Sequence, residues 1–504
     1  MKIKTIAIAS GTALTMGVLF VACGGDSNSL SVTHGTVIQN ATVVNTKDGS
    51  LQTGVSVVID AGKIQTVTSD PLNLTVGTAQ VVDGTGKYVV PGFLDMHTHA
   101  SNTLATPPGD FPVLLANGVT GVREASGSAA LLQTIKQQNA AVVAGTVDAP
   151  EVLLMPSSIF GGQSPTDAGA RQFVRDRLAE GAGFIKITGG SPAAYLGAID
   201  EAKKQGSTSA GHLTLSVSAL DSSNAGFHSF EHLGAGTGLI LDCSTDDVNI
   251  RAGLVANPIV LPNAINPRLY DGNAYAPFYQ RIIDTYSDAK CQALAKTFAA
   301  NDTWQTVTLI RLRTQDYGND PVYRTDPNLQ YVDKTRRALW ESIASQYAAA
   351  IMPAALTTLH NYYALQLRVV KLMKQNGVKM LAASDLGGGL VIPGFSLHQE
   401  FHELAAAGLS PLEILQMTTL NGAQFVGRES TMGTVEAGRN ADLVLLDANP
   451  IADSANLDKV AAVFLRGKYY PRTALDRLLG NVASAYAAGP LRALSTALDP
   501  THLD

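Results

Sequence analysis

Short apolar segments alternate with stretches of helical character through the middle of this chain of 504 residues. The apolar segments are residues 119–122, 152–155, 184–187 and 380–383. Helices are predicted at residues 167–180, 193–205 and 361–376. Such alternation predicts a parallel sheet, because two parallel neighbours need a long crossover that is usually a helix. Eight strand–helix units close into a (β/α)8 TIM barrel of about 250 residues. We expect this α/β barrel over residues 92–427.

The two flanks of this region are rich in β-branched residues. Residues 35–91 contain three such runs separated by turn residues, and residues 428–472 repeat the same character. We therefore predict one small β-sandwich domain formed by both chain ends. Residues 473–504 are predicted to form a C-terminal helix and a loose tail.

The barrel region is longer than a barrel requires, so it must carry insertions. We place them at 235–300 and 312–350, on either side of a predicted seventh strand at 303–309. Both would leave the loop face that carries barrel active sites, so we interpret them as a cap. Decoration on the outside of the barrel is the alternative.

The N-terminus is a targeting segment. Residues 1–23 combine two early lysines, an apolar run and Cys23, which resembles a bacterial signal peptide with a lipobox. Residues 24–34 would be a flexible tether. The chain is therefore expected to be exported and lipidated at Cys23. The lipid would anchor it to a bacterial membrane facing the periplasm, and Gly24 favours the outer membrane. A plain signal peptide, with secretion, is the alternative.

Two further properties bound the possible partners. The formal charge of −6 gives no electrostatic case for nucleic-acid binding, and no long uncharged apolar run follows residue 25.

Besides Cys23, the chain has two cysteines, which are Cys243 and Cys291. Two cysteines in an oxidising compartment favour a disulfide. Two separate buried thiols are the alternative.

Histidines and one lysine stand at unusual places in this pattern. His97 and His99 end a strand-like run, and residues i and i+2 of a strand share a face, about 6.6 Å apart. That pair can bind one metal ion, although two polar residues on a solvated face would show the same spacing. Lys186 lies within an apolar run. Three further polar residues each end a strand-like segment, namely His212, His232 and Asp385.

The order His-x-His, Lys, His, His, Asp resembles the amidohydrolase superfamily of metal-dependent hydrolases. The flanking motifs VDGTGKYVVPGFLD (82–95), LSPLEILQMTTLNGA (409–423) and MGTVEAGRNADLVLLD (432–447) resemble it too. The resemblance covers most of residues 35–470. It points to the binuclear-zinc branch with a carboxylated lysine, which includes prolidases and imidazolonepropionases, here as an exported lipoprotein.

The resemblance implies a site with two divalent metal ions, for which zinc is expected. His97, His99 and Asp385 would hold one ion, and His212 and His232 the other. Lys186, as N6-carboxylysine, would bridge them. A metal-bridged hydroxide would attack the substrate, with Asp385 as general acid and base. A lysine paired with an inward carboxylate is the alternative for Lys186.

Other polar residues are weaker candidates. Arg123 follows a predicted strand and is a candidate substrate contact, although an ion pair is equally expected. His398 and His402 have the i, i+4 spacing of zinc helices, but Gln399 stands where the metalloprotease motif needs glutamate. We take His398 as a second candidate substrate contact. Many relatives carry Gly-Gly-His after the third strand, where this chain has Gln163.

The predicted function is hydrolysis of an amide, peptide or related acyl bond in a small molecule. Cleavage of esters, lactones, carbamates or phosphotriesters by the same site is an alternative. A mononuclear-zinc deaminase is another, which Lys186 argues against because such relatives generally lack it. A non-catalytic metal-binding lipoprotein is the alternative outside enzymes. The sequence is compatible with a homo-oligomer.

Overall fold

The structure, a computed structural model, describes residues 30–74, 78–256 and 272–489. The predicted signal peptide, Cys23 and most of the tether lie outside the described residues, as do residues 490–504 of the tail. One correction concerns the tether. Strand β1 (Leu30–Val32) pairs in parallel with β5 (Leu72–Leu74), so the folded part begins inside the segment predicted to be flexible.

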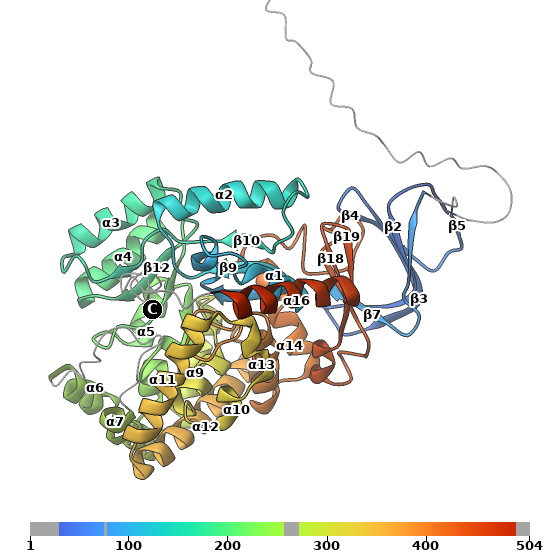
Figure 1. Ribbon diagram of the computed structural model, residues 1–504. Helices are drawn as coiled ribbons and strands as arrows, with labels where there is room; N and C mark the ends of the chain where they lie inside the picture. The colour runs from blue at the N-terminus through green and yellow to red at the C-terminus, as the bar shows by residue number, and fades with distance from the viewer. Residues whose placement is uncertain (1–29, 75–77, 257–271, 490–504) are drawn as a thin grey trace, which may run out of the picture.

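Both chain ends build one small mixed sheet, at the right of Figure 1. Its strand order is β19-β18-β17-β7-β2-β3-β4, and β6 pairs with β2. An apolar core that includes Ile38, Val57 and Phe464 lies against it. The strands are β2 (Thr36–Val44), β3 (Leu51–Asp60), β4 (Lys63–Thr68), β6 (Gln80–Asp83), β7 (Tyr88–Pro91), β17 (Leu443–Leu446), β18 (Val460–Leu465) and β19 (Lys468–Pro471).

The predicted β-sandwich is not confirmed. Among the described strands, only the short β1–β5 pair stands beside the large sheet, and it packs its apolar residues on Val37 and Val58 of β2 and β3. The prediction that both ends share one sheet is confirmed by the antiparallel pairing of β7 with β17.

Parallel strands form the centre of the molecule, as predicted, in two groups. One sheet has the order β10-β9-β8 and the other β11-β12-β13-β14-β15-β16. The strands are β8 (Phe93–Thr98), β9 (Val119–Glu124), β10 (Glu151–Leu154), β11 (Phe160–Gly161), β12 (Ile185–Gly189), β13 (Ser209–Gly211), β14 (Ser229–Glu231), β15 (Trp304–Thr306) and β16 (Met380–Leu381).

The described strands do not form a continuously paired, closed barrel. The Met96 N–H donates to the Ala382 carbonyl at 3.2 Å, which brings β8 beside the end of β16. In the described residues no ladder joins β10 to β11. The Gly183 N–H, before β12, donates to the Met155 carbonyl, after β10, at 2.8 Å.

The three predicted helices are present. They are α3 (Asp167–Ala179), α4 (Pro192–Lys204) and α12 (Pro353–Gln375), the last longer than predicted. Thr166 and Ser191 cap α3 and α4 by accepting backbone N–H groups, which is the usual signal for a helix start. The other main barrel-region helices are α1 (Phe111–Ala116), α2 (Ala129–Val143), α5 (Ala219–Ala225), α13 (Phe395–Ala406), α14 (Pro411–Met417) and α15 (Leu420–Phe425).

Both insertions contact loops that follow the carboxyl ends of central strands. In the first, a guanidinium N–H of Arg251 donates to the Leu215 carbonyl, in the loop after β13, at 2.6 Å. In the second, Arg336 binds both carboxylate oxygens of Asp110, after β8, at 2.7 and 3.1 Å. Their role as a cap stays a prediction. The helices are α6 (Asp247–Ala256), α7 (Gly272–Thr285), α8 (Asp288–Ala300), α9 (Leu309–Asp316), α10 (Pro321–Arg324) and α11 (Lys334–Ala350).

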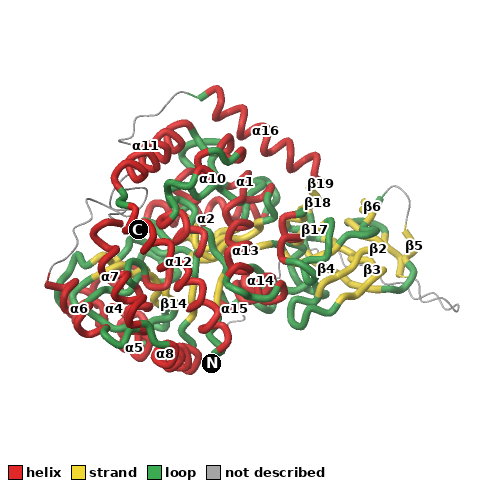
Figure 2. Tube along the Cα trace, turned by 90° about the horizontal axis from the view of Figure 1, so that it is seen from below, coloured by secondary structure: helices red, strands yellow, loops and turns green. Residues whose placement is uncertain are grey.

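The predicted C-terminal helix is α16 (Arg472–Ala488), which runs from β19 of the small sheet toward α11 (Figure 2). It packs on α1, and the Tyr486 hydroxyl donates to the Gly109 carbonyl at 3.3 Å. The helix therefore ties the small sheet to the parallel strands. No helix among the described residues has the length and apolarity needed to cross a membrane.

The predicted disulfide between Cys243 and Cys291 is present and buried. It joins the segment before α6 to α8, so it closes the first insertion on itself. Replacing both cysteines by serine should cost roughly 4 kcal/mol of stability by the chain-entropy estimate for a loop of this size. Urea unfolding of the soluble form without Cys23 would measure this. Two free thiols in the denatured, unreduced protein would contradict the bond.

Candidate metal centre

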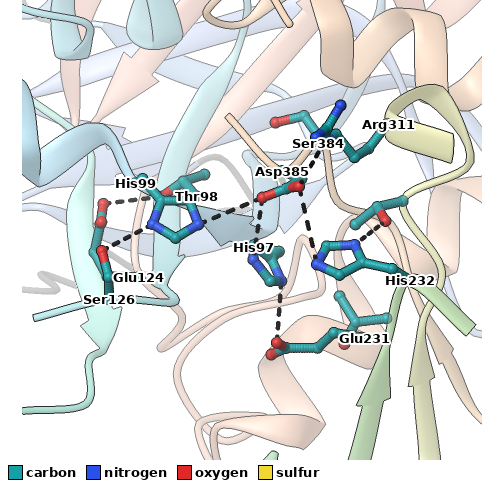
Figure 3. A network of polar contacts seen from close by, with 12 residues as sticks. His97, Thr98, His99, Glu124, Ser126, Glu231, His232, Arg311, Ser384 and Asp385 are labelled. Atoms are coloured by element: carbon teal, nitrogen blue, oxygen red, sulfur yellow. Dashed lines mark hydrogen bonds and ion pairs between the residues drawn. The ribbon is translucent and has the colours of Figure 1, made fainter. Parts of the chain in front are cut away.

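The six predicted metal-site residues come together at one edge of the parallel strands. His97 is in β8 and Lys186 in β12, while His212, His232 and Asp385 directly or closely follow β13, β14 and β16. His99 follows β8. Because the carboxyl ends of parallel strands meet at one edge, residues separated by almost 290 positions lie side by side (Figure 3).

Asp385 lies at the centre of this group. Its Oδ1 is 3.2 Å from Nε2 of His97 and 3.4 Å from Nε2 of His99. Its Oδ2 is 3.9 Å from Nε2 of His232 and 3.2 Å from Nε of Arg311. Burial alone would raise the pKa of Asp385, but the neighbouring His232 and His97 hold it well below its usual range. Asp385 is therefore an anion whose two oxygens face different partners.

The donor set fits divalent metal ions. Two groups of side chains have ligand atoms within 4.8 Å of one another, namely His97, His232 and Asp385, and His212, Glu231 and His232. Among the described atoms, both ring nitrogens of His97 and Oδ1 of Asp385 are buried and have charged neighbours at 3.2–3.5 Å, but none of these contacts has hydrogen-bond geometry. Buried polar atoms are normally satisfied, so these atoms indicate a ligand between them. Imidazole and carboxylate suit zinc and similar ions.

Sequence analysis missed Glu231, which is fully buried. Its Oε2 is 2.5 Å from Nζ of Lys186 and 3.5 Å from Nδ1 of His97, and its Oε1 accepts from Arg123 at 2.7 Å. Burial would raise the pKa of Glu231, but Lys186, His97 and Arg123 hold it well below its usual range. The alternative for Lys186 was an ion pair with an inward carboxylate. In its uncarboxylated form Lys186 makes this pair with Glu231. A charged residue inside a buried parallel strand was the available signal.

A layer of hydrogen bonds orients the ligands. Nδ1 of His99 is 2.8 Å from the Ser126 hydroxyl, and Nδ1 of His232 is 2.6 Å from the Thr308 hydroxyl. Each contact occupies the ring nitrogen that faces away from Asp385. Nε2 is left on the side where an ion would bind, which is the usual arrangement around metal-binding histidines.

The backbone at the site is unusual. Asp385, His232 and Thr308 have positive φ angles of 56°, 54° and 46°, which non-glycine residues rarely adopt. Gly387 lies two residues after Asp385, and a Cβ there would lie 2.9 Å from Cβ of His99. Strained residues of this kind cluster where the fold must aim particular side chains.

Both predicted substrate contacts need correction. Arg123 has no exposed surface, and its Nε donates to the Met96 carbonyl at 2.6 Å while Nη2 pairs with Glu231. His398 contacts the Asn117 carbonyl at 2.9 Å and Asp458 at 3.1 Å, near the strand starts. His398 lies on α13, and the sequence did not show which end of the strands this helix faces.

Comparison with known proteins agrees with this fold. Residues 345–469 match the Amidohydrolase family. Adenine deaminase of Listeria monocytogenes is 33% identical over 86 residues, which is 17% of this chain and 14% of that protein. Imidazolonepropionase of Shouchella clausii is 50% identical over 40 residues, 8% of this chain and 9% of that protein. The chain thus matches a small part of the length of these curated relatives.

Solved structures cover far more of the chain. Bottromycin amidohydrolase superposes with a TM-score of 0.68 at 20% identity, over 92% of this chain and 93% of that one. A Xaa-Pro dipeptidase with bound methionine gives 0.59 at 17% identity, over 86% and 99%. This chain shares their fold. It is a TIM-barrel-type α/β fold, and the proteins that it matches are named as enzymes that act on carbon–nitrogen bonds.

Proposed function

We propose that this protein is a metal-dependent hydrolase of an amide, peptide or related acyl bond in a small molecule. The observation that carries the proposal is the convergence of four histidines, Lys186 and Asp385 at one edge of the parallel strands. In the proposed site His97, His99 and Asp385 would hold one ion, His212 and His232 would hold a second, and carboxylated Lys186 would be a ligand of both.

The environment of Lys186 is compatible with a carbamate. The lysine amine would add to the carbon of CO₂ and release a proton, becoming an anion. It now lies 2.5 Å from Glu231, where two anions would repel one another. Glu231 also accepts from Arg123 through its other oxygen, so a cation would remain beside it when Lys186 turns toward the ions. Arg123 would therefore continue to neutralise the charge of Glu231 after Lys186 has become an anion.

Asp385 is the proposed proton carrier. Bound divalent ions would polarise the substrate carbonyl and lower the pKa of the attacking water. Oδ1 of Asp385 faces His97 and His99, so it is the oxygen placed for an ion. Oδ2 faces the other side of the site, where it can accept a proton from water and return it to the leaving nitrogen.

We expect two metal equivalents per chain. Protein produced with zinc and bicarbonate should give close to two by elemental analysis, and Lys186→Ala should give about one, because it removes the bridge. Lys290→Ala is the matched control, since Lys290 pairs with Asp247 in the first insertion. One equivalent in the parent protein, unchanged in Lys186→Ala, would rule out the carbamate bridge.

The activity itself is tested by a substrate screen of the zinc-loaded protein. The screen includes dipeptides, N-acyl amino acids, aryl amides, carbamates, lactones and organophosphates. Adenine belongs in it too, because of the short match to adenine deaminase. Ammonia released from adenine, without cleavage of any acyl compound, would favour the deaminase. Bound metal without any turnover would favour a non-catalytic metal-binding protein.

We also propose that the protein is exported and anchored through a lipid on Cys23. The proposal rests on the N-terminal sequence, and the buried disulfide supports it, because disulfides persist mainly in oxidising compartments. Mass spectrometry of the mature N-terminus would distinguish a lipidated Cys23 from a plain signal-peptide cleavage.

A further inference from the structure

We propose that a pocket between the small sheet and α2 binds a small organic anion that has an apolar body. The pocket has a volume of about 410 Å³, which is within the usual size of small-molecule sites. Asp148 lines it and precedes the start of β10, whereas the metal centre lies at the other ends of the strands. The inference therefore does not depend on the proposed function.

Two hairpin turns of the small sheet form part of the pocket wall. The β3–β4 turn contributes Ala61 and Gly62, and the β18–β19 turn contributes Arg466. The turns lie against each other, because a Cβ on Gly467 would be 3.3 Å from Cα of Gly62. Most of the remaining lining lies between residues 142 and 148, at the end of α2, and Figure 1 shows α2 ending beside the small sheet.

The charge of the lining favours an anion. Lys63, Arg466 and Lys468 are cationic, and Asp148 is the only carboxylate among the described residues that line the pocket. Asp148 is already paired with Lys468, whose Nζ is 2.8 Å from both carboxylate oxygens. Lys63 donates to Oδ1 of Asn440 at 2.7 Å, and it forms no ion pair with a described carboxylate. Two of the three cations thus have charge to offer to a ligand.

Arg466 stands at the pocket on an unusual backbone. Arg466 and Gly467 have positive φ angles of 51° and 82°, as the two central residues of a type I′ hairpin turn do. Asparagine, aspartate or glycine usually occupies the first of these positions, because other residues rarely adopt positive φ. The ion pair of Arg466 is long, at 3.8 Å from Glu151, which Arg428 binds at 2.7 Å. A long side chain in a strained turn indicates that its charge serves a ligand.

Two buried donors in the lining lack a partner of hydrogen-bond geometry. They are Nδ2 of Asn440 and the hydroxyl of Tyr470, and both residues are 5% exposed. Burial and the neighbouring Asp148 raise the pKa of Tyr470, so its hydroxyl keeps its proton. Buried donors are normally satisfied, so these two indicate an acceptor other than the protein, such as a bound anion or the water that accompanies it.

The apolar part of the lining sets the direction of the ligand. Val143 and Val147, at the end of α2, are 55% and 39% exposed. The carboxyl end of a helix carries partial negative charge, which disfavours an anion beside it. The anionic group should therefore face Lys63 and Arg466, and the apolar body should cover the two valines.

The test is calorimetry of the zinc-loaded full chain with 3-phenylpropionate and with phenyl phosphate, in a buffer without phosphate or carboxylate. Uncharged 3-phenylpropionamide and cationic 3-phenylpropylamine are the comparison ligands. We expect at least one of the anions to bind and neither comparison ligand to do so. Arg466→Asn should weaken this binding about 10-fold or more, because it removes a charged hydrogen-bond donor. Asparagine suits positive φ, so the turn is kept.

Val143→Asp should weaken binding as well, because it places a negative charge at an exposed position of the pocket. Lys47→Gln and Val248→Asp are the matched controls. Lys47 lies between β2 and β3 and pairs with Glu436, and Val248 is 74% exposed on α6. Both controls should bind as the parent protein does. Equal weakening in the controls would overturn the proposal, and so would a parent protein that binds neither anion at millimolar concentration.

Two results separate this pocket from the metal ions, which could also hold an anion. Asp385→Asn should keep the anion binding that Arg466→Asn loses. Hydrogen exchange at residues 142–148 and 465–468 should slow when the anion is bound, as followed by mass spectrometry. Binding that is lost in Asp385→Asn and kept in Arg466→Asn, without slower exchange in these segments, would place the anion at the metal centre and overturn the proposal.

Discussion

Asp385→Asn should lower kcat by at least about 10²-fold while the protein stays folded. The amide cannot accept the proton from water, and it is a poorer ligand than a carboxylate for a divalent ion. The variant keeps the size and shape of the side chain, so packing around the site is preserved. Steady-state kinetics on the best substrate of the acyl screen, with circular dichroism as a check of the fold, measures the effect.

Asp458→Asn is the matched control for this variant. Asp458 contacts His398 and His402 near the strand starts, away from the metal centre, so its loss should leave kcat close to the parent value. Turnover by Asp385→Asn within a few-fold of the parent protein would refute the role of Asp385 as proton carrier.

Glu231→Gln should destabilise the metal-free protein by about 3–5 kcal/mol. Glu231 is the carboxylate that Arg123 and Lys186 share, and all three side chains are fully buried. Its replacement leaves two cations without that anion in a region of low dielectric constant. Urea unfolding of the metal-free full chain, followed by circular dichroism, would give the change in stability.

Glu436→Gln provides the comparison for a solvent-exposed ion pair. Glu436 pairs with Lys47 at 2.6 Å, and both side chains are about half exposed, so this change should cost at most about 1 kcal/mol. If Glu231→Gln costs no more than Glu436→Gln, the buried cluster around Lys186 does not contribute as the geometry indicates.

The sequence predicted the central strands and several helices because their signals are local. Ser and Thr caps precede α3 and α4, and β-branched runs mark the strands of the small sheet. The order in which strands pair is not local. The runs at 35–91 and 428–472 therefore gave the composition of the small sheet, but not its arrangement as one mixed sheet with only a short β1–β5 pair beside it.

Five of the six predicted metal ligands were accessible to sequence analysis because they stand at or just after a strand end, where topology brings them to the site. Lys186 was accessible because a charged residue inside an apolar strand is unusual. Glu231 and Arg311 were missed, although the charge of Glu231 inside a strand-like run was a usable signal. Glu231 precedes His232 directly, and neighbouring strand residues normally point to opposite faces, so its approach to Lys186 depends on packing. Arg311 lies in an ordinary helical segment, and only the path of α9 brings it to Asp385. Arg123 and His398 were predicted to contact substrate, but packing directs them to protein partners. Arg123 pairs with Glu231, and His398 contacts Asn117 and Asp458.

The pairing of β7 with β17 has a consequence for how the chain folds as it is made. Val89 and Val90 of β7 are buried in the finished protein beside Leu445 and Val444. Their partners emerge roughly 350 residues later. At about 5–20 residues per second, this is a delay of tens of seconds. During that time β7 offers an apolar, unpaired strand edge, the kind of surface that recruits other chains. A chain that stops before residue 443 is therefore a state in which we expect chaperone binding, and the pairing of β7 with β17 ends this state.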